Sequence, residues 1–477
     1  MMRILLVCSL AVMAAAKPRQ AVTPIDQWVT DPPSQSGDDR KPVIPVDNSF
    51  EYRNPDFTDD GLELFESDMV LTEAQRSNRQ ASSNLWTSPV SFAISSTSAG
   101  DRTAILAGIQ HWRDRTCIEF NEVSEGSSTP HIKFIKSSGC WSYVGQVTGS
   151  GGQDLSIGTG CTGLGTVAHE IGHALGLSHQ QSRTDRDTYV EILFQNIQSG
   201  REGNFAIRSS SSNYSVPYDL TSVMHYGSTY FTSNGENTIQ VRNFLHEGLI
   251  GNRGGLSHRD QQIANAMYQC ASPCSSPPTC QNGGFVGGSC TCVCPSNTAG
   301  TNCETLNGEY YPGPDCGDQD MRQPGTITSP NYPSNFPVNV VCYWVITAGE
   351  GQTVKVTIND MAMLYRRNGQ CYWDFLALRY SGDVHTNDQK ACDDELQGQS
   401  FTSTGNSFIV QFHSGNYGWH RGFTADVEFL GTAQTTTSTT ASTTTASTTT
   451  ASTTTASTTA ASTAAPSGNC GGARRLP

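Results

Sequence analysis

One stretch of the chain, TVAHEIGHALGLSHQQSRTDRD at residues 166–187, fixes three histidines relative to a helix and a turn. Residues four apart on a helix share a face and lie about 6 Å apart along its axis, so His169 and His173 can direct both imidazoles at one ion. His179 would leave that face if the helix continued, but Gly176 can adopt a positive φ and turn the chain back. The stretch therefore predicts a helix that ends near Gly176 and a site built from three histidines.

Three histidines favour a catalytic zinc site over a structural one. A structural site is usually closed by a fourth ligand, often a thiolate, whereas three neutral imidazoles leave one coordination position for water. Zinc lowers the pKa of such a water toward ~7. Glu170, next to His169, can accept the proton of this water as general base and pass it to the leaving amine. The pattern predicts one Zn²⁺ per subunit and a hydrolytic reaction.

This stretch and a second one downstream resemble a known protease family. The histidine pattern, together with SVMHYG at residues 222–227, resembles the metzincin zinc proteases, and SHQQSRTDRD narrows the resemblance to the astacin family. The resemblance implies a two-lobed α+β domain over residues 80–271, with the zinc in a cleft. By matching position, it implies that Met224 lies in the turn beneath the metal and that Tyr226 stabilises the tetrahedral oxyanion.

The resemblance carries further expectations for this domain. It implies disulfides Cys117–Cys270 and Cys140–Cys161. The alternating HIKFIK at residues 131–136 is expected to be the strand that lines the cleft and pairs with an extended substrate. The family normally has glutamate after the third histidine, where it contacts the new N-terminal ammonium, but this chain has Gln180. We hypothesise that cyclisation of a newly exposed Gln80 removes the charge that this glutamate would have neutralised.

The N-terminal region predicts an exported precursor. Residues 1–16 combine Arg3, a short apolar run and small residues, which is typical of a signal peptide, and the run falls short of the ~20 residues of a membrane span. Residues 17–79 form a predicted propeptide that ends in the processing sequence RSNR, so that cleavage between Arg79 and Gln80 releases the enzyme. An exposed loop with two arginines is the alternative. The expected location is extracellular.

A short motif in the predicted propeptide suggests how the precursor is kept inactive. LFESDMVLT at residues 64–72 resembles the astacin motif in which an aspartate occupies the zinc position meant for water, which makes Asp68 the candidate latch of the zymogen. The family usually has glycine where Ser67 stands. An ordinary acidic loop is the alternative.

Two cysteine-containing modules are predicted after the protease domain. The six cysteines within residues 272–304 resemble an EGF-like domain, which lacks the acidic residues of calcium-binding versions, and residues 316–431 resemble a CUB domain, an all-β sandwich. Asp374 matches one CUB calcium ligand, but Gly415 stands where the partner aspartate is expected, so no calcium site is predicted. The resemblances imply disulfides Cys274–Cys290, Cys280–Cys292, Cys294–Cys303, Cys316–Cys342 and Cys371–Cys392.

Composition limits the remaining possibilities. The formal charge is −14 without any Lys/Arg-rich run, so nucleic acid and anionic membranes are poor candidate partners. Residues 432–477 form a Thr/Ser/Ala-rich repeat that resembles an O-glycosylated stalk and is expected to be disordered. The tail carries Cys470, for which a free thiol, an intermolecular bridge and part of another module all stay open. Asn213 begins the N-glycosylation triplet.

Taken together, the sequence predicts a secreted zinc metalloendopeptidase made as a zymogen. Its expected partners are an activating protease, extracellular protein substrates of the matrix, cuticle or eggshell, and proteins that bind the EGF-like and CUB modules. An adhesion or scaffold protein without catalysis is the alternative, which the presence of Glu170 opposes because zinc binding needs only the histidines. A metal-dependent hydrolase acting on something other than peptides has no further support in the sequence.

Overall fold

The computed structural model describes residues 54–78, 84–208, 213–311 and 316–433, the last range without 318, 339, 367, 368, 370, 372, 386, 416 and 417. The predicted signal peptide, the bond between Arg79 and Gln80, and Cys470 with almost all of the repetitive tail lie outside the described residues. No described helix is both long and apolar enough to cross a membrane.

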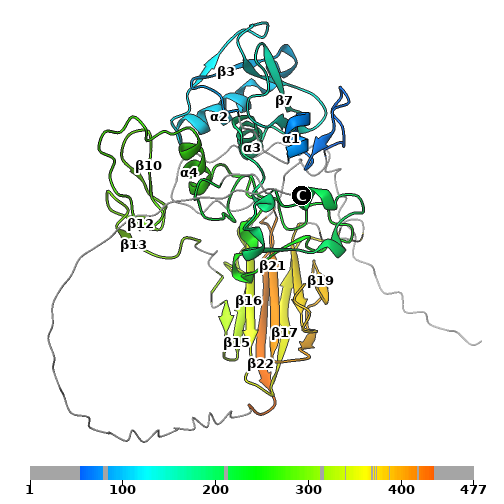
Figure 1. Ribbon diagram of the computed structural model, residues 1–477. Helices are drawn as coiled ribbons and strands as arrows, with labels where there is room; N and C mark the ends of the chain where they lie inside the picture. Colours follow the sequence, from blue (N-terminus) through cyan, green and yellow to red (C-terminus); the bar gives the residue numbers. More distant parts are fainter. Residues whose placement is uncertain are drawn as a thin grey trace, which may run out of the picture. The chain divides into compact units, whose positions relative to one another are not determined.

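A seven-stranded sheet forms the first lobe of the protease-like region, and predicted propeptide residues supply its edge (Figure 1). The strand order is β1-β2-β6-β7-β5-β3-β4. β2 pairs in parallel with β6, which runs antiparallel to β7. The bounds are β1 (Leu64–Phe65), β2 (Met69–Val70), β3 (Val90–Ile94), β4 (Phe120–Glu122), β5 (His131–Ile135), β6 (Cys140–Tyr143) and β7 (Gly152–Ile157).

One expectation about this sheet was wrong. HIKFIK does form a strand, β5, but β5 lies in the interior with β3 on one side and β7 on the other. Both of its backbone edges are therefore already hydrogen-bonded, and no substrate strand can pair there. The strand that carries the propeptide is β6, with the sequence CWSY.

Two helices pack against each other beneath this sheet. In α2 (Arg102–Arg113), Ile105, Ile109 and Trp112 form an apolar stripe and are completely buried. They pack against α3 (Leu164–Leu175), whose residues are nearly all buried, and the indole of Trp112 donates a hydrogen bond to the Ala168 carbonyl (3.0 Å). The short helix α1 (Glu73–Asn78) follows the propeptide strands. The histidine-bearing helix is thus held inside the core.

The second lobe consists mainly of turns around its own apolar cluster. The helix α4 (His258–Met267) packs Ala264 and Met267 on the core cluster of the first lobe, whereas the second lobe contains the antiparallel pair β8 (Val190–Ile192) and β9 (Ile239–Val241). Its cluster includes Phe205, Tyr226 and Tyr230. The 3₁₀ helices are η3 (Ser96–Asp101) in the first lobe and η4 (Gln180–Ser182), η5 (Arg186–Thr188), η6 (Phe194–Asn196), η7 (Glu202–Phe205) and η8 (Phe244–Leu249) in the second.

The segment from Cys274 to Leu306 has little regular structure and three disulfides. Its strand pairs are β10 (Phe285–Val286) with β11 (Cys292–Val293), and β12 (Thr298–Ala299) with β13 (Thr305–Leu306). The described chain contains seven disulfides, and they join the pairs that the family resemblances imply: 117–270, 140–161, 274–290, 280–292, 294–303, 316–342 and 371–392.

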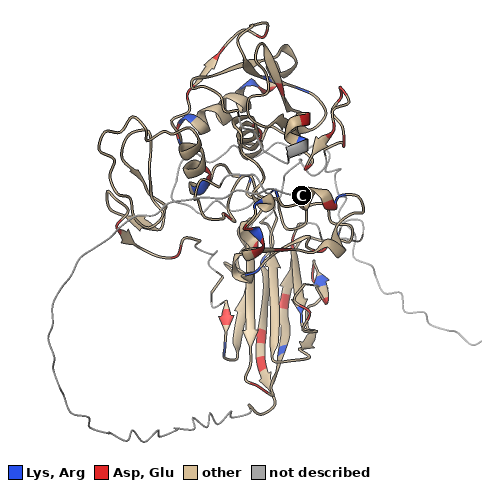
Figure 2. Cartoon of the chain, viewed as in Figure 1, with Lys and Arg blue, Asp and Glu red and all other residues tan. Residues whose placement is uncertain are grey.

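Residues 316–433 form two sheets packed face to face, as an all-β sandwich requires (Figure 1). One sheet has the order β14-β16-β21-β18-β19 and the other β15-β22-β17-β20. Alternate residues such as Cys342, Trp344 and Ile346 fill the space between them. The bounds are β14 (Asp320–Met321), β15 (Gly325–Thr328), β16 (Val341–Thr347), β17 (Thr353–Ala362), β18 (Phe375–Arg379), β19 (Gln389–Ala391), β20 (Ser400–Thr402), β21 (Ser407–His413) and β22 (Gly422–Leu430). Basic and acidic residues are scattered over the described chain (Figure 2).

Candidate metal centre

The predicted helix and turn place the three histidines. α3 carries His169 and His173 and ends at Leu175. Gly176 follows with φ of 111°, in the left-handed region, and its N–H bonds to the His173 carbonyl at 2.8 Å. The reversed chain then brings His179 back to the face of α3 that carries the other two imidazoles, and all three rings are buried.

The three imidazoles converge on one carboxylate. Asp68 Oδ2 lies 3.3 Å from His169 Nε2 and 3.1 Å from His179 Nε2, and Asp68 Oδ1 lies 3.6 Å from His173 Nε2. One ligand atom from each of these four residues lies within 4.8 Å of all the others. Three nitrogens and one oxygen form a donor set that suits tetrahedral zinc.

The outer nitrogens of the histidines set their tautomers. His169 Nδ1 donates to the Val223 carbonyl (2.8 Å), and His173 Nδ1 donates to the Leu177 carbonyl (2.9 Å). Because these Nδ1 atoms carry the protons, the inner Nε2 atoms of the neutral rings present lone pairs. The Nε2 atoms of His169 and His173 are only 3.1 Å apart, so their lone pairs repel unless a cation lies between them and Asp68. The residues therefore fit a bound metal ion.

Burial and the neighbouring charges shift the pKa values at this site. Burial alone would raise the pKa of Asp68, but His179 and the other two imidazoles hold it well below its usual range. Burial would lower the pKa of His179, but the carboxylates of Asp68 and Glu66 outweigh it and raise the pKa to about 9. For His173, burial and His169 keep the pKa well below the ordinary value. The site thus favours an ionised carboxylate.

The turn at residues 222–226 lies directly below α3. A Cβ added to Gly172 would lie 3.0 Å from Met224 Sδ, which places the predicted methionine against the histidine-bearing helix. Tyr226 is also buried, and its ring centroid lies 4.7 Å from that of His179. Met224 therefore lies against α3, and Tyr226 lies beside the third histidine.

Comparison with known proteins identifies this region. Residues 78–269 match the family profile described as Astacin, a peptidase family, and residues 316–427 match the CUB domain profile. Residues 78–269 belong to the astacin family. Zinc is the metal of this family, in agreement with the donor set of the site.

Several relatives resemble this chain beyond the astacin domain. Blastula protease 10 of Paracentrotus lividus is 36% identical over 406 residues, covering 79% of this chain and 66% of the relative. Protein SpAN of Strongylocentrotus purpuratus is 36% identical over 393 residues, covering 80% and 62%. The chain thus spans less than two thirds of the length of these relatives. Among solved structures, High choriolytic enzyme 1 of Oryzias latipes, a hatching enzyme zinc-protease, is 32% identical, covers 40% of this chain and 99% of its own, and gives a TM-score of 0.36.

Two residues that the sequence prediction missed fix the turn of the astacin domain. Asp260 accepts hydrogen bonds from Ser222 Oγ (2.5 Å) and the Val223 N–H (2.8 Å). Arg253 Nη1 donates to the carbonyls of Val223 (2.9 Å) and His225 (3.1 Å). Burial, together with Asp219, raises the pKa of Asp260 to about 7. The sequence signal for Asp260 was its place in a capping box with Ser257, whereas Arg253 has no local signal.

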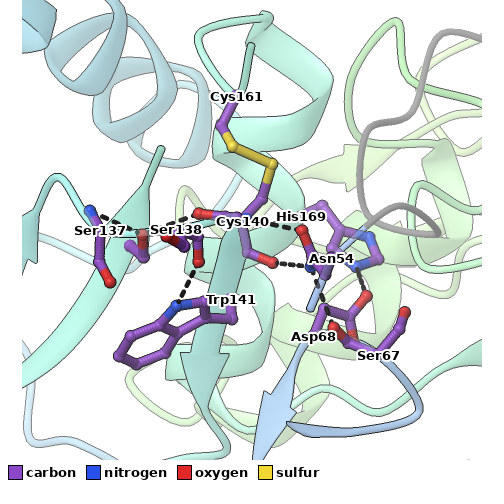
Figure 3. The surroundings of a disulfide bond; sticks show 11 residues. Asn54, Ser67, Asp68, Ser137, Ser138, Cys140, Trp141, Cys161 and His169 are labelled. Carbon is purple, nitrogen blue, oxygen red and sulfur yellow. Dashed lines mark hydrogen bonds and ion pairs between the residues drawn. A yellow bond between two sulfur atoms is a disulfide. The ribbon is translucent and has the colours of Figure 1, made fainter. Parts of the chain in front are cut away.

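Asp68 reaches the astacin domain because its backbone is held on the edge of the sheet. The Ser142 N–H donates to the Asp68 carbonyl at 2.8 Å. Asn54 joins Ser67 to the disulfide-bonded Cys140: its Nδ2 donates to the Ser67 carbonyl (3.0 Å), and the Cys140 N–H donates to its Oδ1 (3.0 Å). Figure 3 shows this connection, with the Asp68 carboxylate directed at His169.

The departure from the family at Ser67 has a local structural cost. Ser67 has φ of 70°, in the left-handed region where glycine is favoured. A serine in this conformation costs on the order of 1 kcal/mol relative to glycine. The hydrogen bonds from Asn54 to the Ser67 carbonyl and from the Ser142 N–H to the Asp68 carbonyl hold the turn in this conformation despite that cost.

Glu66 and Arg208 are further residues that the sequence prediction missed. Glu66 Oε2 accepts a hydrogen bond from His179 Nδ1 (2.7 Å), and Glu66 Oε1 lies 3.1 Å from Arg208 Nε. The Tyr226 hydroxyl donates to the Glu66 carbonyl (2.6 Å). Nothing in the local sequence around Arg208 predicts this role, because the two charged residues are far apart in the chain. Glu170, the predicted general base, is buried on α3 beside His169.

Proposed function

We propose that this chain is a secreted zinc metalloendopeptidase that is made as a zymogen and cleaves extracellular proteins. The observation that carries the proposal is the convergence of three imidazoles on Asp68, a residue of a different segment, with Glu170 adjacent on the same helix. One of the relatives, blastula protease 10, is named as a protease, which supports the same reaction class. Substrates of the matrix, cuticle or eggshell are part of the proposal.

The roles of the residues follow from their chemistry. His169, His173 and His179 would hold the zinc ion, which when bound would polarise the peptide carbonyl and acidify the attacking water. Glu170 accepts the proton of that water and transfers it to the leaving amine nitrogen. The Tyr226 hydroxyl donates a hydrogen bond to the oxyanion that forms as the carbonyl carbon becomes tetrahedral.

The propeptide supplies the inhibition in this proposal. Asp68 occupies the position that faces all three Nε2 atoms, so a nucleophilic water has no place there before processing. Cleavage between Arg79 and Gln80 would free the propeptide strand β2 from β6, and Asp68 would leave with it. Residues 272–304 as an EGF-like module and the CUB domain would contribute recognition of protein partners. The exposed Asn213 is available for glycosylation.

The latch has a direct test in the uncleaved chain. Asp68→Ala removes the carboxylate, so the zymogen is expected to gain hydrolytic activity before processing. Ser67→Gly is the matched control, because it relieves the left-handed turn and leaves the carboxylate in place; it should stay inactive. A silent Asp68→Ala zymogen whose processed form is active would rule out the latch.

Hydrolysis itself is tested with casein and material processed after Arg79. The proposal expects digestion by the processed wild-type chain and at least a thousand-fold slower digestion by Glu170→Gln. Zinc content measured on both proteins should be equal, because Glu170 is not among the ligands. Equal activity of the two proteins would rule out Glu170 as the general base. No activity in a zinc-loaded wild-type chain would favour the adhesion or scaffold alternative.

A further inference from the structure

A second carboxylate of the propeptide is buried beside the metal centre. The Arg208 Nε lies 3.1 Å from Glu66 Oε1, and the two side chains are 3% and 0% exposed. The guanidinium carbon of Arg208 lies 4.5 Å from the centroid of the Phe65 ring, so the neighbouring propeptide residue also packs on the cation. The Glu66 carboxylate of the propeptide therefore lies against a buried guanidinium of the astacin domain.

The surroundings of Arg208 hold this cation in position. Its backbone N–H donates to the Ser182 carbonyl (2.8 Å), which ties it to η4, just after the third histidine. Its Nη1 donates to Ser178 Oγ at 3.4 Å. Since both contacts come from the astacin domain, Arg208 is held there independently of the propeptide.

The second partner of Glu66 distinguishes His179 from the other two histidines. The Nδ1 atoms of His169 and His173 donate to backbone carbonyls of the astacin domain itself. The Nδ1 of His179 donates instead to Glu66 Oε2 (2.7 Å), while its Nε2 faces Asp68 (3.1 Å). The propeptide thus contacts both nitrogens of one imidazole, and Glu66 takes the one that points away from Asp68.

We propose that Arg208 and the Nδ1–H of His179 form a carboxylate-binding site, separate from the metal position, which Glu66 fills in the zymogen as a second anchor of the propeptide. The ligand is the side-chain carboxylate of Glu66, two residues before Asp68, whose carboxylate faces the metal position. Because both side chains are buried, removing the charge of either one should weaken the binding of the propeptide. A buried carboxylate without a cation beside it is energetically unfavourable. The site rests on the proposed function only in that it needs the uncleaved propeptide.

Occupation of this site also affects Tyr226. The hydroxyl of Tyr226 donates to the carbonyl of Glu66 at 2.6 Å. When the Glu66 side chain is bound at Arg208, its backbone carbonyl is held where it engages this hydroxyl. The anchor therefore keeps the proposed oxyanion donor occupied, in addition to fixing the chain that leads to Asp68.

The test measures how tightly the propeptide is held, without using hydrolysis. Full-length zymogens in a Glu170→Gln background, which prevents self-cleavage, are compared by hydrogen exchange of the amides of residues 64–70. The variants are Glu66→Gln, Arg208→Gln and the double variant. Glu63→Gln is the matched control, because Glu63 pairs with Arg76 at the surface of the same segment.

Each single variant is expected to speed exchange of these amides at least tenfold, and the double variant should exchange no faster than the faster single variant. Glu63→Gln should stay within twofold of the parent. An exchange rate in Glu66→Gln within twofold of the parent would overturn the proposal. So would a double variant whose increase in exchange rate equals the product of the increases in the two single variants. Should Arg208→Gln fail to fold, as judged by circular dichroism, Glu66→Gln alone decides.

Repeating the measurement with zinc-loaded and chelator-treated zymogen separates this site from the metal centre. The effect of Glu66→Gln is expected in both states, because Glu66 contacts the outer nitrogen of His179 rather than the metal position. An effect confined to the zinc-loaded protein would overturn a separate site. Because none of these readouts requires hydrolysis, failure of the proposed protease activity and failure of the carboxylate site give different results.

Discussion

Gly165→Ala should destabilise the chain, although helix propensity predicts the opposite. Gly165 lies in the first turn of α3, where alanine would ordinarily be favoured over glycine by about 1 kcal/mol. A Cβ at this position would lie 1.8 Å from the Arg253 carbonyl oxygen, whereas ordinary contacts begin at 3.4 Å. Helix and loop must therefore separate by about 1.6 Å, and Arg253, which holds the turn below the histidines, moves with the loop. We expect a net loss of about 3 kcal/mol in the free energy of unfolding.

The matched control for this substitution lies two residues earlier. A Cβ at Gly163 would have its nearest contact, Thr166 Oγ1, at 3.8 Å, and its φ of −61° suits alanine. Gly163→Ala changes only the N-cap of α3 and should therefore lower the free energy of unfolding by less than about 1 kcal/mol. Denaturant unfolding of the Glu170→Gln zymogen, with zinc retention measured on the same samples, compares the two variants. Equal stability of the Gly165 and Gly163 variants would refute the close approach of α3 to Arg253.

Three further predictions concern the turn below the metal centre. In the processed enzyme, Tyr226→Phe should lower kcat about 10²-fold with little change in KM, measured on a peptide substrate, because one oxyanion donor is lost. Arg253→Met should lower the free energy of unfolding by about 3 kcal/mol, since carbonyls at Val223 and His225 lose a charged donor; unchanged denaturation midpoints would contradict this. Burial lowers the pKa of His225 to about 4. Between pH ~6.5 and 4, His225 is therefore protonated in the unfolded chain and neutral in the folded chain. Thermal stability should therefore fall as pH decreases from ~6.5 toward 4, and His225→Gln should flatten that dependence.

The local part of the metal centre was predictable from the sequence. His169, His173, Gly176 and His179 lie within eleven residues, and helical geometry with one left-handed glycine determines how they meet. No packing information is needed for that step. Tyr226 and Met224 came only from the family resemblance, because their approach to α3 depends on the tertiary fold.

The missed residues depend on contacts between distant segments. Glu66 lies beside Arg208 in a fold in which β2 pairs with β6, and the spacing between the two residues carries no periodic signal. The error over HIKFIK has a similar cause. Alternation of apolar residues predicts a strand, but it does not say which neighbours the strand will have, and β5 turned out to be flanked on both sides.

The most direct test of the central claim replaces the propeptide carboxylate with a sulfur. In an Asp68→Cys zymogen, zinc-edge X-ray absorption should show three imidazole nitrogens and one sulfur at about 2.3 Å, because position 68 faces all three histidines. After cleavage at Arg79 and removal of the propeptide, the sulfur signal should disappear while the three nitrogens stay. A zinc-free protein, a zymogen spectrum without sulfur, or sulfur that persists after the propeptide has left would contradict the account.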